Sequence, residues 1–217
     1  MTIVKPTTIG ESLYWSYANL AMAFSSARHS QATYQQIDFI VRNKIYYQLL
    51  RGSIHIGSFV IDEKAKIRNS DICCYCGGES DLTLDHLIPQ FKGGRHSADN
   101  LVVACRSCNS SKKALDLLEW MDKRDEFPPL HLLRRYLKLA IAYCVEHDLM
   151  HAVLEPREGA SPRPPSLFDG IPSDGASENC GRVASALPFA LELVPYTFPE
   201  PGDMCGKTNS QNDETEE

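Results

Sequence analysis

The sequence predicts an α+β protein. A small strand–loop–strand–helix unit is held by a four-cysteine zinc site, flanked by helices and followed by a disordered C-terminal tail. Three observations support this fold class. Two C-x-x-C pairs bracket the central unit, apolar residues recur at helical spacing on both sides of it, and the chain after residue 153 is rich in proline, glycine and acidic side chains.

The composition fits one globular domain with additional segments, or two small domains. Of the 217 residues, 43% are hydrophobic and 23% are charged, which is too apolar for a chain that is disordered throughout. No stretch approaches the roughly 18 consecutive apolar residues of a membrane-spanning helix, and the N-terminus lacks the apolar core of a signal peptide. We therefore expect a soluble, cytoplasmic protein with no membrane partner.

The negative charge of the chain belongs to its C-terminal part. The formal net charge is −6, but residues 1–120 carry 13 Lys and Arg against 11 Asp and Glu, whereas residues 154–217 carry 4 against 12. Because the body of the protein is close to neutral, its charge neither excludes nor favours a nucleic-acid partner.

Residues 1–67 are expected to form an N-terminal helical region whose role the sequence does not indicate. Residues 11–29 and 32–51 place apolar side chains at helical spacing, and Gly52 can end the second helix. Residues 53–61 are rich in β-branched side chains and are expected to be extended.

After the central segment we expect an amphipathic helix within residues 128–152 and a Pro/Gly-rich acidic tail at 153–217. Three cations on the helix form either a solvated face or a strip that faces phosphates. Nine of the 13 prolines lie in the tail, which predicts disorder except for a short apolar piece at 186–196. The three cations are Arg134, Arg135 and Lys138.

The two C-x-x-C pairs predict a structural zinc site. Four thiolates suit tetrahedral zinc, since each pair can wrap one side of the ion. The 28 residues between the pairs exceed the roughly 15–20 of a simple zinc ribbon, so a further unit is inserted there. Four reduced thiols without metal are the alternative. The expected zinc ligands are Cys73, Cys76, Cys105 and Cys108.

The inserted segment is typical of two short antiparallel strands joined by a loop. Residues 82–85 alternate apolar and polar side chains, and residues 101–104 are apolar and β-prone. Pro89 and the Gly93–Gly94 pair end the first strand. A helix is expected over residues 106–121, opening at the second C-x-x-C pair.

The pattern C-x-x-C, D-H-x-x-P, G-G, N-L and C-x-x-C-N-x-x-K resembles the HNH endonuclease family, in the branch with a four-cysteine zinc site. The resemblance covers residues 73–118 and implies a ββα-metal nuclease domain at 68–122. It implies an endonuclease that hydrolyses phosphodiester bonds in DNA. The implied cofactors are Zn²⁺ as a structural ion and Mg²⁺ or Mn²⁺ as the catalytic ion.

The resemblance gives each matched residue a role. His86 corresponds to the general base that activates water, and Asn100 to the residue that braces the loop and orients this histidine. Asp85 and Asn109 correspond to the ligands of the catalytic cation. Because the third signature position holds Asn rather than His, the chain resembles the H-N-N variant. The basic side chains expected to bind nucleic acid are Arg95, Lys112 and Lys113.

Two other functions stay open. A zinc-knuckle module could bind nucleic acid or protein without catalysis, although it would have no need for Asp85, His86 and Asn109 together. The same nuclease site could act on RNA. Nothing in the sequence selects a target sequence or a pathway, a protein partner or dimer is not indicated, and His96 is left without a role.

Overall fold

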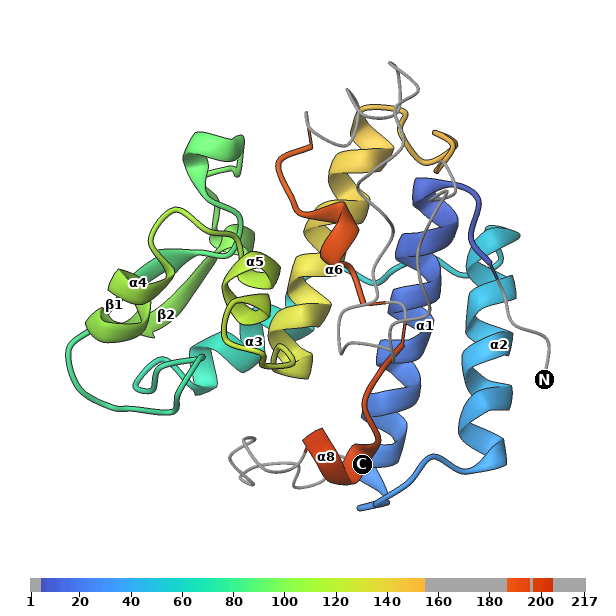
Figure 1. Cartoon of the computed structure of the whole chain (residues 1–217), viewed down its shortest axis with the longest axis horizontal. Coiled ribbons are helices and arrows are strands. Elements are labelled where there is room, and N and C mark those ends of the chain that lie inside the picture. Colours follow the sequence, from blue (N-terminus) through green and yellow to red (C-terminus); the bar gives the residue numbers. More distant parts are fainter. Residues whose placement is uncertain (1–4, 155–186, 196, 205–217) are drawn as a thin grey trace.

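Helices surround a two-stranded hairpin in the computed structural model, which describes residues 5–154, 187–195 and 197–204 (Figure 1). Helices α1, α2 and α6 lie side by side, and β1, β2 and α4 form a smaller lobe (Figure 1). This mixture confirms the predicted α+β class. With 3-10 helices labelled η, the described elements are α1 (Ile9–Arg28), α2 (Gln36–Leu50), α3 (Val60–Arg68), β1 (Leu82–His86), η1 (Gln90–Lys92), η2 (Ala98–Asn100), β2 (Leu101–Cys105), α4 (Arg106–Lys112), α5 (Leu117–Asp122), α6 (Leu130–Glu146), η3 (Leu191–Leu193) and α8 (Pro201–Met204).

The apolar spacing of residues 11–29 and 32–51 corresponds to α1 and α2, which pack against each other as a hairpin. Trp15 of α1 meets Tyr46 of α2 edge to face, with ring centroids 5.2 Å apart. The guanidinium of Arg42 lies 4.4 Å from the centroid of the Trp15 ring, where a cation is attracted to the aromatic face. These aromatic side chains therefore serve the contact between the two helices.

The expectation of an extended segment at residues 53–61 is wrong at its C-terminal end. Residues 53–59 contain no strand, and α3 begins at Val60. Residues 63–68 are mostly good helix formers. Because they directly follow the β-branched stretch, the helix that they favour begins at Val60 and includes the end of that stretch. Asp62, in the first turn of α3, is also held by ion pairs from α6.

The cations of α6 bind α3 and the hairpin lobe. Asp62 is 5% exposed and accepts hydrogen bonds from Arg134 Nε at 2.7 Å and Lys138 Nζ at 2.6 Å. Arg135 donates from Nε to the backbone oxygen of Asp99 in η2 at 2.7 Å. These interactions occupy the side chains that a strip facing phosphates would need free, so the structure does not support that alternative.

A single cluster of buried apolar side chains runs through both lobes. Burying one such side chain stabilises a fold by about 1.5–3 kcal/mol, so the hairpin lobe depends on the helices for much of its stability. Leu87 directly follows β1 and Val102 lies in β2, and both pack with residues of α1 and α6. Members of this cluster include Leu13, Leu20, Leu87, Val102, Leu118, Leu133 and Leu137.

Residues 187–195 pack into this same cluster. Asp116 is fully buried and accepts hydrogen bonds from the backbone N–H of Ala190 at 2.8 Å and from the Tyr136 hydroxyl at 2.9 Å. The short apolar piece expected at 186–196 thus largely coincides with a docked segment. The other residues of the predicted tail, apart from 153–154 and 197–204, lie outside the described residues.

The helix α8 lies against the loop between α1 and α2. The backbone N–H of Gly202 donates to the Ala32 oxygen at 2.8 Å, and the Glu200 carboxylate accepts from the Tyr34 N–H at 2.8 Å. Within the described part of the chain, no helix is long and apolar enough to cross a membrane.

Replacing Asp116 by alanine should lower the free energy of unfolding by about 3 kcal/mol. The change leaves the buried Tyr136 hydroxyl without its acceptor, removes one of the two acceptors of the Ala190 N–H, and removes the side chain that caps α5. Urea unfolding followed by circular dichroism measures the change. The exposed Asp122→Ala substitution at the end of α5 is the matched control and should change the value by less than about 0.5 kcal/mol. Equal effects of the two substitutions would contradict the assigned role of Asp116.

Candidate active site

The four predicted zinc ligands converge on one point. Their sulfur atoms all lie within 4.8 Å of one another, and the Cys76 and Cys105 sulfurs are 3.7 Å apart. A tetrahedral zinc ion with Zn–S bonds of about 2.3 Å separates its sulfurs by about 3.8 Å. The cluster can therefore hold a metal ion such as zinc.

The cysteine cluster joins the two ends of a β-hairpin to the helix that follows it. β1 and β2 are antiparallel, with Leu82 opposite Cys105 and His86 opposite Leu101. The first cysteine pair precedes β1, and the second lies at the junction of β2 and α4. The backbone N–H of Cys74 donates to the Val103 oxygen of β2 at 2.9 Å. The metal-binding turn is thus attached directly to the sheet that carries the candidate site residues.

Asp85 lies in β1 with its carboxylate held from two sides. The Tyr75 hydroxyl donates to its Oδ2 at 2.7 Å, and Lys112 Nζ lies 3.1 Å from the same oxygen. Lys112 Nζ also donates to the backbone oxygen of His86 at 2.6 Å. The Tyr75 ring meets Trp120 edge to face at 4.9 Å between centroids. These contacts fix the orientation of a carboxylate that is only 6% exposed.

The position of Lys112 differs from the expectation that it binds nucleic acid. Its side chain is fully buried, because it lies one helical turn after Asn109 on the side of α4 that packs against β1. Burial lowers the pKa of Lys112, and the Asp85 carboxylate opposes this shift. In this structure the ammonium group serves Asp85 and the His86 backbone.

Asn100 braces the loop between the two strands. Its side chain is 1% exposed; Oδ1 accepts from the Ile88 N–H at 2.9 Å, and Nδ2 donates to the oxygens of Ile88 at 2.8 Å and Arg95 at 2.9 Å. The loop passes so close to itself that a Cβ atom on Gly94 would lie 2.0 Å from the Ile88 oxygen. One asparagine side chain therefore ties the start of the loop to its second half.

His86 lies at the end of β1 and contacts a second histidine. Its Nε2 is 2.9 Å from Nδ1 of His96. Burial and the neighbouring His96 lower the pKa of His86 below its usual value. The neutral imidazole, which is the form that can accept a proton, is therefore favoured at neutral pH.

Asn109 reaches β1 from α4. Its Nδ2 donates to the Leu84 backbone oxygen at 3.2 Å, next to Asp85. This leaves the amide oxygen Oδ1 with no partner among the described residues. A carboxylate and an amide oxygen are hard donors of the kind that Mg²⁺ and Mn²⁺ prefer, so the donor set of Asp85 and Asn109 fits such a cation.

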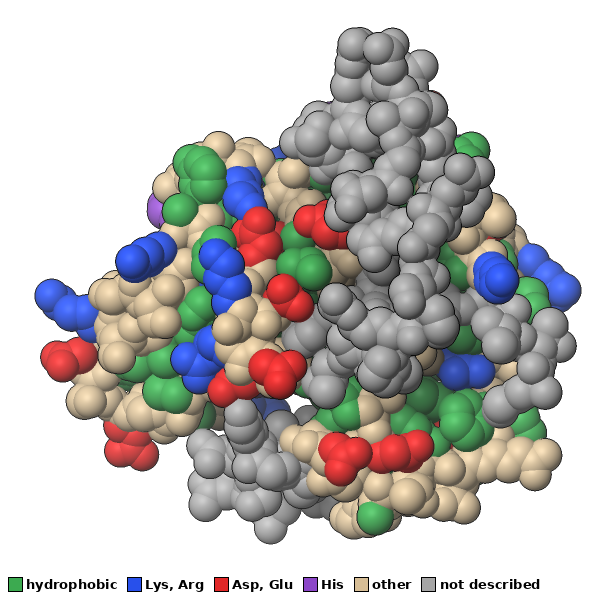
Figure 2. All heavy atoms as spheres, in the orientation of Figure 1, with side chains coloured by type: hydrophobic (Ala, Val, Ile, Leu, Met, Phe, Trp, Pro, Cys, Tyr) green, Lys and Arg blue, Asp and Glu red, His purple; other side chains and the backbone are tan. Residues whose placement is uncertain are grey.

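The other predicted nucleic-acid contacts lie on the surface of the lobe. The Arg95 guanidinium pairs with Glu146 of α6 at 2.5 Å, and Lys113 is exposed directly after α4. Figure 2 shows Lys and Arg side chains on the visible face of this lobe, interspersed with Asp and Glu side chains. The visible face therefore carries both signs of charge.

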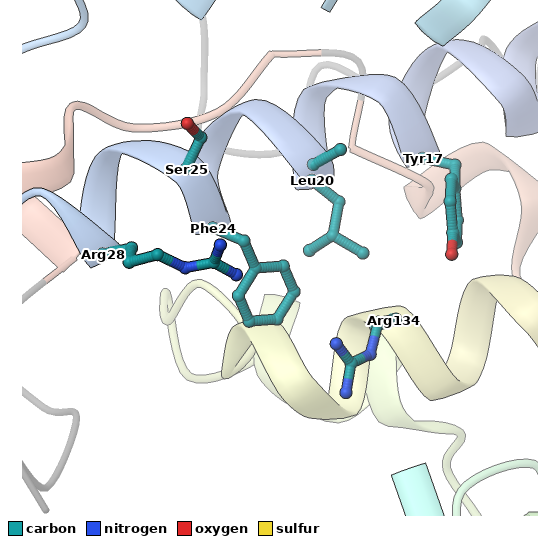
Figure 3. Close-up of a pocket in the computed structure, with 7 residues that line it drawn as sticks. Tyr17, Leu20, Phe24, Ser25, Arg28 and Arg134 are labelled. Atoms are coloured by element: carbon teal, nitrogen blue, oxygen red, sulfur yellow. The ribbon is translucent and has the colours of Figure 1, made fainter. Parts of the chain in front are cut away.

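A pocket of about 320 Å³ lies elsewhere, between α1 and α6 (Figure 3). The Arg134 guanidinium lies 5.0 Å from the centroid of the Phe24 ring that lines it. None of the predicted site residues contributes to this pocket, so it is separate from the candidate active site. Its lining residues are Tyr17, Leu20, Ala21, Phe24, Ser25, Arg28 and Arg134.

Two residues near the candidate site were missed by the sequence analysis. Tyr75 stands inside the first C-x-x-C pair, and its spacing alone does not indicate that its hydroxyl reaches Asp85. His96 lies ten residues after His86 in the braced loop. Its position two residues after Gly94 is the only sequence signal for it, since a tight turn there can fold the loop back toward β1.

A cysteine cluster that can hold a metal, a hairpin whose first strand ends in Asp-His and a helix that supplies Asn define a ββα unit. Residues 73–116 match the family model described as HNH endonuclease. Together with the cysteine cluster, the match confirms the resemblance inferred from the motifs and indicates a nuclease-type enzyme that binds nucleic acid. Helices α1, α2, α3 and α6 lie outside the match. None of the curated proteins matches the chain.

Metal analysis should find about one zinc ion per chain, and Cys73→Ala should remove it. Loss of one thiolate opens the cluster, and a lobe of this size has little core of its own to replace it. We expect the variant to lose zinc and to unfold in the hairpin lobe, as measured by elemental analysis and hydrogen exchange. Cys74→Ala is the control, because Cys74 lies outside the cluster and its removal should leave zinc in place. Zinc loss in the control alone would show that Cys74 is the true ligand.

Proposed function

We propose that the protein is a metal-dependent endonuclease that hydrolyses phosphodiester bonds in DNA, with His86 as the general base. The observation that supports this proposal is that three motif residues lie on or beside one short strand. β1 supplies Asp85 and His86 from successive positions, and the hydrogen bond to the Leu84 oxygen brings Asn109 of α4 to the same strand. An HNH domain match over these residues supports the same activity.

Asp85 and Asn109 would hold the catalytic cation through their oxygen atoms. A bound Mg²⁺ or Mn²⁺ supplies stabilisation for the negative charge that builds on the phosphate and on the leaving oxygen. Asp85 is ready for this task because Tyr75 and Lys112 fix its carboxylate before the cation binds. Such pre-orientation reduces what must be ordered at the moment of reaction.

His86 would accept the proton of the attacking water. The lowered pKa of His86 favours its neutral form, and a positioned base contributes most when its pKa lies near the working pH. The water then attacks the phosphorus in line with the leaving 3′ oxygen. The products are a 5′-phosphate and a 3′-hydroxyl, as the resemblance to the family implies.

Asn100 would keep the loop and the strand end in register during this step. Its three hydrogen bonds to Ile88 and Arg95 lie just beyond His86 in the chain. Because Asn100 is buried and uncharged, it does this without competing for the cation. Arg95 and Lys113 would contact the phosphate backbone, which positions nucleic acid without reading its sequence.

The first test is a nicking assay on supercoiled plasmid DNA, run beside single-stranded RNA, with Mg²⁺ or Mn²⁺. His86→Ala should reduce the cleavage rate by about 100-fold or more, because no other group replaces the base. The exposed His55→Ala variant should cleave at the wild-type rate, and all three proteins should contain equal zinc. Cleavage of RNA alone would move the substrate class to RNA. Zinc-loaded wild-type protein that binds but never cleaves either nucleic acid would favour the binding module.

A second test concerns the cation ligand. Tyr75→Phe keeps the ring against Trp120 but removes the hydroxyl that orients Asp85, so the dissociation constant for Mn²⁺ should rise by about tenfold. Electron paramagnetic resonance of free Mn²⁺ measures this without substrate. Tyr47→Phe, on the exposed side of α2, is the control. Unchanged Mn²⁺ affinity with zinc retained would contradict the role of Tyr75.

A further inference from the structure

The contact between His86 and His96 restricts which ring nitrogen of each histidine carries a hydrogen. Their nitrogens Nε2 and Nδ1 are 2.9 Å apart, and the ring centroids are 5.2 Å apart with an angle of 44° between the planes. At this distance one nitrogen donates a hydrogen and the other accepts it. The contact therefore links the tautomer of one imidazole to that of the other.

The loop that carries His96 is held in place by its backbone. The oxygen of Arg95, the residue before His96, accepts a hydrogen bond from the buried Asn100 side chain at 2.9 Å. On the other side of the contact, Lys112 Nζ donates to the backbone oxygen of His86 at 2.6 Å. Both histidines are thus attached to fixed backbone. His96 itself is exposed, so it does not serve to fill the core.

Only one of the two possible arrangements leaves His86 able to act as a base. If His96 donated to Nε2 of His86, the neutral His86 ring would carry its hydrogen on Nδ1 and would have no free lone pair. If His86 donates from Nε2, its Nδ1 keeps a free lone pair and can accept a proton from water.

We propose that His96 is a positioning residue, which accepts the hydrogen bond of His86 Nε2–H at its own Nδ1 and thereby directs the free lone pair of His86 Nδ1 toward the attacking water. This inference rests on the proposed nuclease function. His96 acts only through His86 and touches neither the substrate nor the cation. This role explains why His96, which is not one of the motif residues, lies beside His86.

The choice of side chain at position 96 tests the inference. Asparagine has its Oδ1 as many bonds from the backbone as Nδ1 of histidine, so His96→Asn can still accept the hydrogen bond. Glutamine places its oxygen at the position of Nε2 instead, so His96→Gln cannot accept it in the same geometry. The two variants have the same chemistry and differ only in reach.

We expect His96→Ala to lower kcat by at least about tenfold, since a misplaced base costs rate rather than affinity. His96→Asn should restore most of this loss, His96→Gln should not, and KM for plasmid DNA should stay within about twofold in all three variants. Equal rates for the Asn and Gln variants would overturn the proposal. So would a change confined to KM that His96→Lys reverses, because that pattern belongs to a phosphate contact.

A spectroscopic measurement separates this inference from the nuclease function itself. Nitrogen-15 chemical shifts of labelled imidazoles report which ring nitrogen carries the hydrogen. We expect the Nε2–H form of His86 in the wild type and in His96→Asn, and a mixture of tautomers in His96→Ala. A wild-type His86 with its hydrogen on Nδ1 would overturn the proposal even if the enzyme cleaves DNA. Failure of the wild type to cleave any nucleic acid would overturn the proposed function, while the shifts would still decide whether His96 fixes the tautomer.

Discussion

The four-cysteine cluster is the constraint on which the candidate active site depends. It joins the turn before β1 to the junction of β2 and α4, and so sets the distance between the strand that carries Asp85 and the helix that carries Asn109. Tyr75 lies within the first cysteine pair and donates directly to Asp85. The position of the turn that carries the first cysteine pair therefore helps to set the orientation of the Asp85 carboxylate, through the Tyr75 side chain. A hairpin and a short helix have too little core to maintain this arrangement otherwise.

The helices outside the HNH match hold the other side of the site. Arg135 of α6 donates to the Asp99 oxygen, immediately before the bracing residue Asn100. Leu87, next to the proposed general base His86, packs in the same core as α1 and α6. The docked segment 187–195 is attached to the same core by the hydrogen bond from the Ala190 N–H to Asp116. In the described structure, the flanking elements therefore act as the support that keeps the loop between the strands in place.

The sequence was sufficient for the parts of the site that depend on short spacing. The cysteine pairs, the Asp85–His86 pair and the two-strand fold follow from local patterns that physical chemistry restricts tightly. The inward direction of Lys112, the ion pairs of Lys138 and the docking of Ala190 did not follow from it. Lys138 pairs with Asp62, which lies 76 residues away in the chain. Ala190 donates to Asp116, which lies 74 residues away. Such contacts depend on how whole helices pack, which no local pattern specifies.

The buried Lys112 has a consequence for the charge of the site. Its ammonium balances the Asp85 carboxylate, and Asn109 is neutral, so a bound divalent cation would leave the site with a net charge of two positive units. A phosphodiester carries one negative charge, and the transition state for attack by a deprotonated water carries two. With the proposed cation bound, the charge of the site would match the transition state better than the bound substrate, which is the condition for binding energy to lower the barrier. With a second carboxylate in place of Asn109, this preference would be weaker, which gives a physical reason for an amide at that position.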